Sequence, residues 1–505
     1  MTDWHRFPDA SLWQTWWYRH RETIGWMTAY ALMNIVVFVL RYSRYPSDSC
    51  VSSWPAIAKG SAELVLLNCV LTLLTVSYGF LDRLRPSRRS FLWLARPLEK
   101  HQTLHMLTGS VVILMAVVHS IAWALIVHAA RSCSESDWES SRFHHHPFLR
   151  DGESIAELMK RLPMWTGIVL LGCVLILLSF CLPCVRRRCF KAFAAVHVVV
   201  LVPFVGILLF HGVDQWSSRL QAPYWLLPPI ALYLFEHRRR LSMNAGTVDV
   251  LGYGCTSDTI SLTLAKPDRF TRRFKPGMFV YLQVPDVSRL EWHPFSVTSA
   301  PDDANVQLRL RIVGDWTKAV SEWLATPCSD RVVRLDGPFG TPSLAYQQYD
   351  HVMLVAAGMG ITPFLSVLRH HLHLLRRPDH EGIRPRTLRL VWVLREAERA
   401  EWLVETLADF SDLTPLLATV DIQLFLTARS DDVSTASSND LLRCFPGRPH
   451  WPSVVHVWLD SAPHEQSHAL FVCGSHTVAR ALKQSVARVQ QQQRRGLALY
   501  EETFT

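Results

Sequence analysis

Long apolar stretches dominate the first 235 residues of this 505-residue chain. Each approaches the ~20 residues that an α-helix needs to cross the hydrocarbon layer of a bilayer. The six stretches cover residues 23–40, 61–80, 104–127, 164–184, 193–213 and 222–235, and the last is short and proline-rich. The rest of the sequence has the mixed composition of a soluble protein. We therefore predict a six-helix transmembrane domain over residues 1–241, followed by soluble domains.

Positive charge alternates between the loops that join these stretches. The basic residues of the second loop, of the fourth loop and after the sixth stretch are Arg83, Arg85, Arg88, Arg89, Arg96 and Lys100, then Arg186, Arg187, Arg188 and Lys191, then Arg238, Arg239 and Arg240. Because basic loops stay in the cytosol, we expect both termini there, in a multi-pass protein of the plasma membrane or an endomembrane. The same pattern accounts for the net charge of +9, so no nucleic-acid partner is predicted.

Two cysteines fall in loops on the predicted outer side. Cys50 follows the first apolar stretch and Cys133 follows the third. Disulfides persist on that side of a membrane, but the spacing of two cysteines does not decide whether they are bridged. The sequence leaves this pairing open.

The third and fifth stretches each carry two histidines that are fourteen residues apart. These are His105 and His119 in the third stretch, and His197 and His211 in the fifth. Fourteen residues rise about 21 Å along a helix and return nearly to the same face. Ionisable groups inside a membrane are costly and therefore indicate function. Two such helices side by side predict two stacked bis-histidine sites, suited to two b-type haems. The loop charges place His105 and His197 near the cytosol and the other two near the outer face.

The soluble part shows two successive patterns. Short alternating runs at 260–264, 279–284 and 306–312, separated by Pro and Gly turns, predict an antiparallel β-barrel over residues 242–348. Near-continuous apolar strands at 351–357 and 388–394, each followed by a helical pattern, predict an α/β domain over residues 349–505. Residues 429–467, rich in Ser, Asp and Pro, are expected to form a long loop.

Two segments of the barrel region have the chemistry that a flavin requires. A flavin needs an aromatic or proline wall, a hydrogen-bond donor near its reactive nitrogen, and cations or backbone amides for its pyrophosphate. We expect Phe295 and Ser296 at the isoalloxazine and Arg309 and Arg311 at the phosphates; the alternative is an ordinary strand and turn with exposed arginines. The predicted FAD contacts are His293, Pro294, Phe295, Ser296, Ser299, Arg309, Arg311 and Thr317.

A glycine-containing turn follows the first strand of the α/β domain. In Gly358-Met-Gly-Ile-Thr-Pro363 the glycines let the backbone approach a pyrophosphate at a helix N-terminus, although the third glycine of a Rossmann fingerprint is missing. Arg395 follows the next strand, where a guanidinium can bind a 2′-phosphate, which favours NADPH over NADH. Cys473 and Gly474 follow another short strand and are expected near the nicotinamide. The other predicted nucleotide or flavin contacts are Gly337, Gly358, Gly360, Thr362 and Pro363.

With these motifs in view, the chain resembles the catalytic subunit of the NADPH oxidases, in the ferric reductase superfamily. The segments that carry the resemblance are 292–301 (WHPFSVTSAP), 311–317 (RIVGDWT), 336–340 (DGPFG), 358–364 (GMGITPF) and 447–449 (GRP). The resemblance implies six helices with two haems, then an FAD barrel and an NADPH domain like those of ferredoxin reductases. It also implies oxygen as the electron acceptor and superoxide or hydrogen peroxide as the product.

The resemblance also implies roles for single residues. An aromatic residue near the end of such chains covers the flavin, and Phe504 matches it, although Thr505 follows here. Lys59 matches a basic residue of the second helix near the outer haem, and Trp123 stands where a second histidine is frequent. Activation would come from a small membrane subunit or cytosolic factors, or the enzyme is constitutively active; the sequence does not decide.

Three hypotheses follow for the function. The first is an NADPH oxidase, and the second is a transmembrane ferric-chelate reductase with the same architecture. The third is a membrane scaffold without catalytic activity, which predicts no haem. The four matched histidines and the nucleotide motifs favour the first two over the third.

Overall fold

The computed structural model describes residues 12–77, 79–81, 101–145, 154–212, 221–239, 246–327, 330–379, 382–395, 400–410, 419–428, 442–461, 463, 465–493 and 497–502. The chain divides into two compact units, one mainly from residues 23–237 and one mainly from residues 238–505. Each unit has its own hydrophobic core, and each is considered by itself below.

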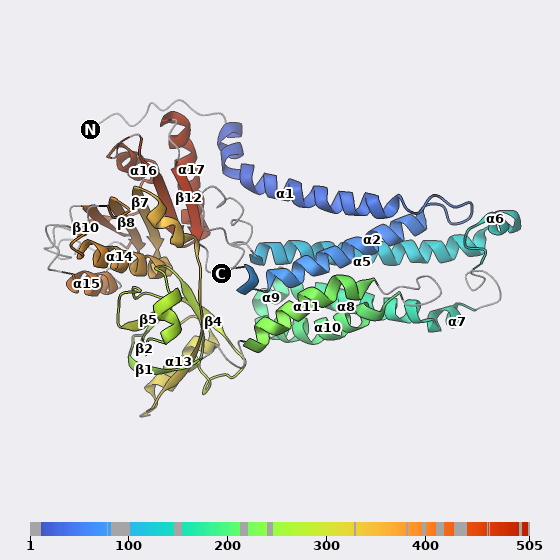
Figure 1. Ribbon diagram of the computed structural model, residues 1–505, viewed down its shortest axis with the longest axis horizontal. Helices are drawn as coiled ribbons and strands as arrows, with labels where there is room; N and C mark the ends of the chain where they lie inside the picture. Colours follow the sequence, from blue (N-terminus) through green and yellow to red (C-terminus); the bar gives the residue numbers. More distant parts are fainter. Residues whose placement is uncertain are drawn as a thin grey trace. The chain divides into compact units, whose positions relative to one another are not determined.

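The first unit is a bundle of long helices lying side by side (Figure 1). They are α1 (Leu12–Tyr42), α2 (Trp54–Thr75), α5 (His101–Ser132), α8 (Leu162–Cys181), α10 (Phe190–Phe210) and α11 (Ala222–Arg239), with short helices α6 (Glu135–Ser140), α7 (Ile155–Lys160) and α9 (Pro183–Arg188). Within the described residues, five helices are long and apolar enough to cross a membrane, and they lie in α1, α2, α5, α8 and α10. The sixth predicted stretch is also helical, but α11 contains Pro228 and Pro229 and is less apolar.

The outward faces of the bundle helices are apolar, which suits contact with lipid. Leu32, Ile35, Val198, Val199 and Val202 are each more than half exposed. Inside, α2 packs along α5, and half of its spanning window is buried. In soluble proteins such apolar side chains are mostly buried, so their exposure here agrees with the membrane domain predicted from the sequence.

A disulfide links Cys50 to Cys133, with their Cα atoms 5.6 Å apart. It joins the α1–α2 connection to the segment that follows α5. Both cysteines pack beside a buried cluster that includes Ile126 and Trp138. The bridge that the sequence left open is therefore present, and it ties α1 and α5 together at one end of the bundle.

The second unit begins with a six-stranded antiparallel sheet. Its strands are β1 (Gly246–Cys255), β2 (Thr259–Ala265), β3 (Phe279–Gln283), β4 (His293–Ser296), β5 (Asn305–Arg311) and β6 (Val332–Phe339), with helices α12 (Asp268–Arg273) and α13 (Asp315–Ala325). The strand order is β4-β3-β6-β1-β2-β5, and a bridge between Val297 and Leu308 brings the two edges together. Val306, Leu308 and Leu310 alternate with half-buried residues and are fully buried, so one face of the sheet forms the core of the predicted barrel.

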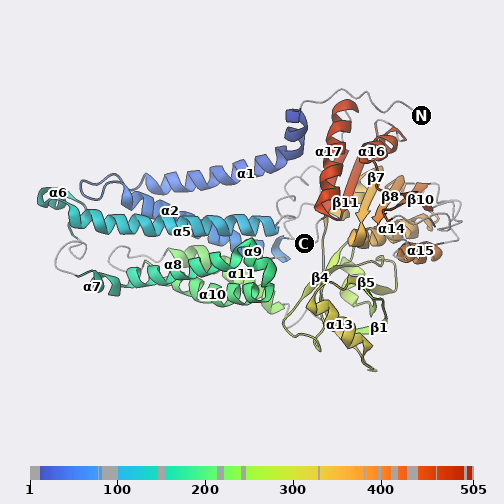
Figure 2. The same cartoon turned by 180° about the vertical axis from the view of Figure 1, so that it is seen from behind.

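A parallel six-stranded sheet follows, with helices packed against it (Figure 2). Its strands are β7 (His351–Ala357), β8 (Thr387–Leu394), β9 (Val420–Leu426), β10 (Leu442–Pro446), β11 (His468–Cys473) and β12 (Leu497–Glu502), and its helices are α14 (Thr362–Leu375), α15 (Glu401–Ala408), α16 (Trp451–Asp460) and α17 (His476–Gln493). The order β10-β9-β8-β7-β11-β12 reverses direction between β7 and β11. Open parallel sheets bind ligands at such a switch point, beside the carboxyl ends of the strands.

The predicted long loop over 429–467 is wrong for two segments. Residues 442–446 form β10, which pairs in parallel with β9, and residues 451–460 form α16. The many Ser, Asp and Pro residues around these segments are typical of loops, so the strand and helix patterns were not recognised. Pairing with β9, and burial of Val455, Trp458 and Leu459 against the sheet, stabilise them in the tertiary structure.

The barrel and the α/β sheet are joined by polar contacts to α14. Arg369 Nε donates to Asp303 Oδ2 at 2.8 Å, and His373 Nε2 lies 2.8 Å from Asp303 Oδ1. Ser366 Oγ donates to the Ser299 carbonyl at 2.7 Å, and both residues are fully buried. Because α14 starts at the glycine turn, these contacts fix that turn relative to the barrel. Further contacts join Asp302 to His370 and Arg377, and Arg309 to Glu405.

The Asp303→Asn substitution should weaken this joint. Burial raises the pKa of the Asp303 carboxyl, but hydrogen bonds from His373 and Arg369 outweigh burial and hold the pKa well below its usual range. The folded state therefore binds fewer protons, so the stabilisation is complete above about pH 4 and is lost as the pH falls below that value. We expect the variant to lose about 3 kcal/mol at neutral pH, because a neutral amide replaces the carboxylate that pairs with the partly buried Arg369, whose other ion pair is to the more exposed Asp409.

Thermal unfolding of the purified full-length protein, followed by tryptophan fluorescence at several pH values, measures this loss. Asp379→Asn is the matched control, since Asp379 is exposed just beyond α14. An unchanged melting temperature for Asp303→Asn at neutral pH would show that the contact contributes nothing.

Candidate functional site

The four predicted histidines of the bundle meet as two pairs. The ring centroids of His105 and His197 are 6.1 Å apart, and those of His119 and His211 are 6.2 Å apart. A metal between two imidazoles, with bonds of about 2 Å as in zinc sites and about 1 Å more to each ring centre, separates the centroids by about 6 Å. Both predicted pairings are therefore geometrically suited to one iron each.

Each imidazole has a polar partner at Nδ1. His119 Nδ1 lies 2.8 Å from the Ala58 carbonyl oxygen, and His211 Nδ1 lies 2.8 Å from Thr166 Oγ1. His105 Nδ1 lies 3.0 Å from Thr75 Oγ1, and His197 Nδ1 lies 3.9 Å from Cys181 Sγ. With Nδ1 engaged, Nε2 is the nitrogen left for a metal, as in most metal-binding histidines. These partners were not predicted from the sequence, because they come from helices that only the fold brings beside the histidines.

Apolar side chains separate the two pairs along the bundle. Val112 lies between His105 and His119 on α5, while Phe204 and Leu208 lie between His197 on α10 and His211 directly after it, and all three are buried in one cluster. No group of three or more His, Cys, Asp or Glu side chains that could hold a metal occurs in the described part of the chain. Two imidazoles alone do not complete a protein metal site, so each pair suits a metal that brings a macrocycle with it.

Lys59 lies on α2, directly after the residue whose carbonyl accepts from His119. Its charge acts on both His119 and His211. Trp123 meets His119 edge-on, with ring centroids 6.5 Å apart. The structure therefore places Lys59 and Trp123 beside the second histidine pair. Their roles there stay predictions.

The predicted isoalloxazine wall is an aromatic surface on the barrel. The ring of His293 stacks on Trp316 with centroids 4.1 Å apart, and Phe295 stacks on the same indole at 6.0 Å. The buried His293 Nε2 atom lies 3.8 Å from Glu291 Oε2. Pro294 is exposed, whereas Ser296 is buried at the end of β4. Trp316 lies within the 311–317 motif but was not predicted as a contact, although a tryptophan in that position was a usable signal.

The predicted phosphate contacts have separate surroundings. Arg309 is ion-paired with Glu405 and lies over the Trp402 ring, on the boundary with the α/β sheet. Arg311 is exposed at the end of β5. Thr317 Oγ1 accepts from the backbone N–H groups of Val313 and Gly314, which caps α13, and Ser299 anchors the loop beside β5. Arg311 is thus the last cation before this helix N-terminus, where anions bind favourably.

The glycine turn lies at the switch point between β7 and β11. A Cβ on Gly360 would come within 2.1 Å of the Cys473 carbonyl oxygen, and a Cβ on Gly474 would come within 2.7 Å of Ala357 Cβ. Gly358 has φ +56° and open space around its Cβ position, and its carbonyl accepts from Trp392 Nε1 at 3.0 Å. Glycine is therefore required by close backbone approach at Gly360, and Gly358 leaves room for a ligand.

The remaining predicted contacts lie at the start of α14, after β8, at the end of β11, on barrel strand β6, or outside the described residues. Thr362 and Pro363 begin α14, and Arg395 is exposed directly after β8, which neighbours β7. Cys473 is almost fully buried, and burial together with the nearby Glu502 carboxylate raises the pKa of its thiol. Gly337 has φ +124° and its Cβ position is crowded by Phe339. Phe504 lies outside the described residues.

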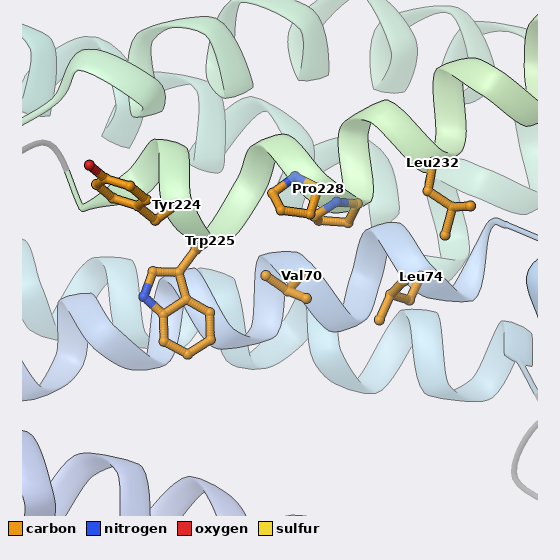
Figure 3. A pocket seen from close by; sticks show the side chains of 7 residues that line it. Val70, Leu74, Tyr224, Trp225, Pro228 and Leu232 are labelled. Carbon is orange, nitrogen blue, oxygen red and sulfur yellow. The ribbon is translucent and has the colours of Figure 1, made fainter.

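An apolar groove in the bundle is separate from these sites. It lies between α2 and α11 and is lined by Val70, Leu74, Tyr224, Trp225, Pro228, Pro229 and Leu232 (Figure 3). None of these side chains is a predicted site residue, so the groove belongs to neither the histidine pairs nor the nucleotide crevice.

Known protein families and individual proteins match this chain along most of its length. Three family models match consecutive parts of the chain: a ferric reductase like transmembrane component over residues 59–208, an FAD-binding domain over 241–343, and a ferric reductase NAD binding domain over 349–487. A superoxide-generating NADPH oxidase heavy chain of Dictyostelium discoideum is 26% identical and is matched over 94% of this chain and 96% of its own length. The chain is therefore similar to superoxide-generating NADPH oxidases over almost its whole length.

Other NADPH oxidases match this chain at similar levels of identity. NADPH oxidase 5 of Homo sapiens is 24% identical over 93% of this chain and 68% of its own length, and NADPH oxidase 1 of Mus musculus is 24% identical over 97% and 95%. Among solved structures, a ferredoxin NADP+ reductase from Neisseria gonorrhoeae with bound FAD and NADP covers 51% of this chain and 98% of its own length at 16% identity, with a TM-score of 0.38.

The Gly360→Ala substitution should disable the nucleotide crevice. The added methyl group would collide with backbone rather than with a flexible side chain, so β7 and β11 must separate there. A strained core costs about 1–3 kcal/mol, and we expect at least a tenfold rise in the NADPH concentration that half-reduces the flavin. Anaerobic flavin reduction, followed by absorbance, measures this. Gly382→Ala is the control, since its Cβ position is open; equal behaviour of both variants would contradict the role of Gly360.

Proposed function

We propose that this chain transfers electrons from NADPH on the cytosolic side, through FAD and two b-type haems, to molecular oxygen on the opposite face of the membrane. One NADPH would reduce two oxygen molecules to two superoxide anions, releasing NADP+ and one proton, and superoxide can dismutate to hydrogen peroxide. The observation that carries the proposal is the pair of stacked bis-histidine sites in a chain that also contains an FAD-binding and a nucleotide-binding domain.

The cofactors divide the chemistry between them. FAD, when bound, turns a two-electron hydride into single electrons, and haem iron passes them one at a time. His105 and His197 would hold one haem, and His119 and His211 the other. The buried side chains of Val112, Phe204 and Leu208 lie between the two pairs and would make the path between the haems apolar.

Residues of the soluble unit would bind and orient the other cofactors. We propose that His293, Phe295 and Trp316 flank the flavin, and that Arg311 and the N-terminus of α13 neutralise its phosphates. The open space at Gly358 would admit the NADPH pyrophosphate to the start of α14, and Arg395 would bind the 2′-phosphate.

Orientation and partners complete the proposal. The arginines of α9, Arg186 to Arg188, of which Arg187 and Arg188 are exposed, support a cytosolic position for the α8–α10 connection. His105 and His197 would then lie near the cytosol, and Lys59 would lie beside the outer haem, where its charge attracts an anionic product. Activation by a small membrane subunit or by cytosolic factors is proposed from the family resemblance alone.

A transmembrane ferric reductase is the second candidate, because the family model that matches residues 59–208 is named for that activity. The two functions differ in the acceptor. Purified protein given NADPH should form superoxide without added iron, detected by reduction of cytochrome c that superoxide dismutase inhibits. Inertness towards oxygen together with rapid ferric-chelate reduction would decide for the second function.

His211→Ala should separate the two halves of the electron path. The variant should lose one of two haems and more than nine-tenths of oxygen reduction, while NADPH still reduces the flavin at the parent rate. The haem-to-flavin ratio and anaerobic flavin reduction are the two measurements. His128→Ala is a suitable control, because His128 lies on the same helix as His119 but is not among the paired histidines. Full oxygen reduction by His211→Ala would contradict the assignment.

Arg395→Ala should change nucleotide preference rather than turnover. Loss of a guanidinium at a 2′-phosphate removes a charge-assisted contact of about 1.5–3 kcal/mol, so KM for NADPH should rise at least tenfold while KM for NADH stays within about twofold. Steady-state kinetics with both nucleotides test this. Equal changes for both would remove Arg395 from the 2′-phosphate site.

A further inference from the structure

We infer that Thr166 and Thr75 are positioning residues that fix the tautomer of His211 and His105, and so present the Nε2 lone pair of each imidazole to iron. The inference rests on the proposed function, in which these imidazoles hold haem. It concerns neighbouring helices that carry no haem ligand themselves, and it assigns a chemical task to two hydroxyl groups inside the bundle.

The Thr166 hydroxyl can only accept a hydrogen bond from His211, because its hydrogen is already donated elsewhere. A threonine hydroxyl has one hydrogen and two lone pairs. Thr166 Oγ1 donates that hydrogen to the Leu162 carbonyl, one turn earlier on α8, at 2.5 Å. The contact of 2.8 Å between Thr166 Oγ1 and His211 Nδ1 must then be an N–H donated by the imidazole. Nδ1 of His211 carries the proton, and Nε2 carries the lone pair.

The same reasoning applies to Thr75 on α2. Its hydroxyl donates to the Thr72 carbonyl at 2.6 Å, so its lone pair faces His105 Nδ1 at 3.0 Å. His105 Nδ1 therefore faces an acceptor, which again gives the Nδ1–H tautomer.

His119 provides an independent check on this tautomer. Its Nδ1 faces the Ala58 carbonyl oxygen at 2.8 Å, and a carbonyl can only accept. Three of the four imidazoles thus have the same tautomer. In His119 a backbone carbonyl accepts from Nδ1–H, and in His105 and His211 the acceptor is a threonine hydroxyl whose hydrogen is already donated within its own helix. The fourth, His197, faces the weak acceptor Cys181 Sγ at 3.9 Å.

Close packing makes Thr166 the more informative of the two threonines. Thr166 is 3% exposed, and a Cβ on the adjacent Gly167 would lie 3.4 Å from His211 Cε1, so α8 packs directly on the ring. In the other tautomer, or with the ring flipped, a lone pair or a carbon would face the hydroxyl oxygen. An acceptor at Nδ1 also raises the basicity of the coordinating nitrogen, which favours ferric over ferrous iron.

Thr166→Val tests the inference, because it keeps the shape of the side chain and removes the acceptor. Partners of this kind typically change metal affinity by about 10–100-fold. We expect haem retention at one of the two sites to fall by that factor, measured as the haem-to-flavin ratio after purification. In the protein that keeps haem, the midpoint potential of one haem should rise while the other stays unchanged, measured by spectroelectrochemical titration.

Two further variants distinguish positioning from general packing. Thr166→Ser keeps the acceptor and should restore both the haem ratio and the potential. Thr108→Val removes another buried hydroxyl of the bundle, which bonds to the Leu104 and His105 carbonyls and to Thr72 Oγ1 but to no imidazole nitrogen, and should leave both haems unchanged.

The outcomes separate this inference from the proposed function. Parent haem content and potentials in Thr166→Val would overturn it, and so would equal losses in Thr166→Ser or in Thr108→Val. A parent protein that purifies with flavin but without reducible b-type absorption bands would overturn the proposed function itself, before any variant is compared.

Discussion

The structure depends on four imidazoles that face one another in two pairs inside an apolar bundle. Polar, ionisable rings are costly in such surroundings, and each ring is stabilised by a partner at Nδ1. Those partners come from α2 and α8, which pack against the histidine-bearing helices. The packing of all four helices is therefore linked to the geometry of the two sites. The spacing of the pairs follows from the fourteen-residue separation of His105 from His119 and of His197 from His211.

The soluble unit follows a different principle, in which backbone approach rather than side-chain chemistry shapes the site. Gly360 and Gly474 bring the ends of β7 and β11 together at the switch point of the parallel sheet. The charged joint around Asp303 then holds α14, and with it the glycine turn, against the barrel. These contacts hold the barrel and the α/β domain together in one compact unit.

Several side chains expected at cofactors also have structural tasks. Ser299 and Thr317 both use their hydroxyls to hold backbone segments, and Arg309 pairs with Glu405 on the α/β side. Their predicted roles as FAD contacts stay predictions. Phe295 and His293 instead form a stacked aromatic surface with Trp316. Some residues of the predicted flavin motif thus form a surface for a ring, and others hold the backbone in place. The sequence does not indicate which residues do which.

The sequence by itself determined the membrane bundle, the order of the domains and the pairing of the histidines, because helical periodicity and apolar length are local properties of the chain. It also placed the glycine turn directly after a strand. The tertiary structure alone decided the Nδ1 partners Ala58, Thr75, Thr166 and Cys181, the Cys50–Cys133 bridge, and the strand β10 within a segment expected to be a loop. Each of these depends on which distant segments pack side by side, and no local pattern of residues carries that information.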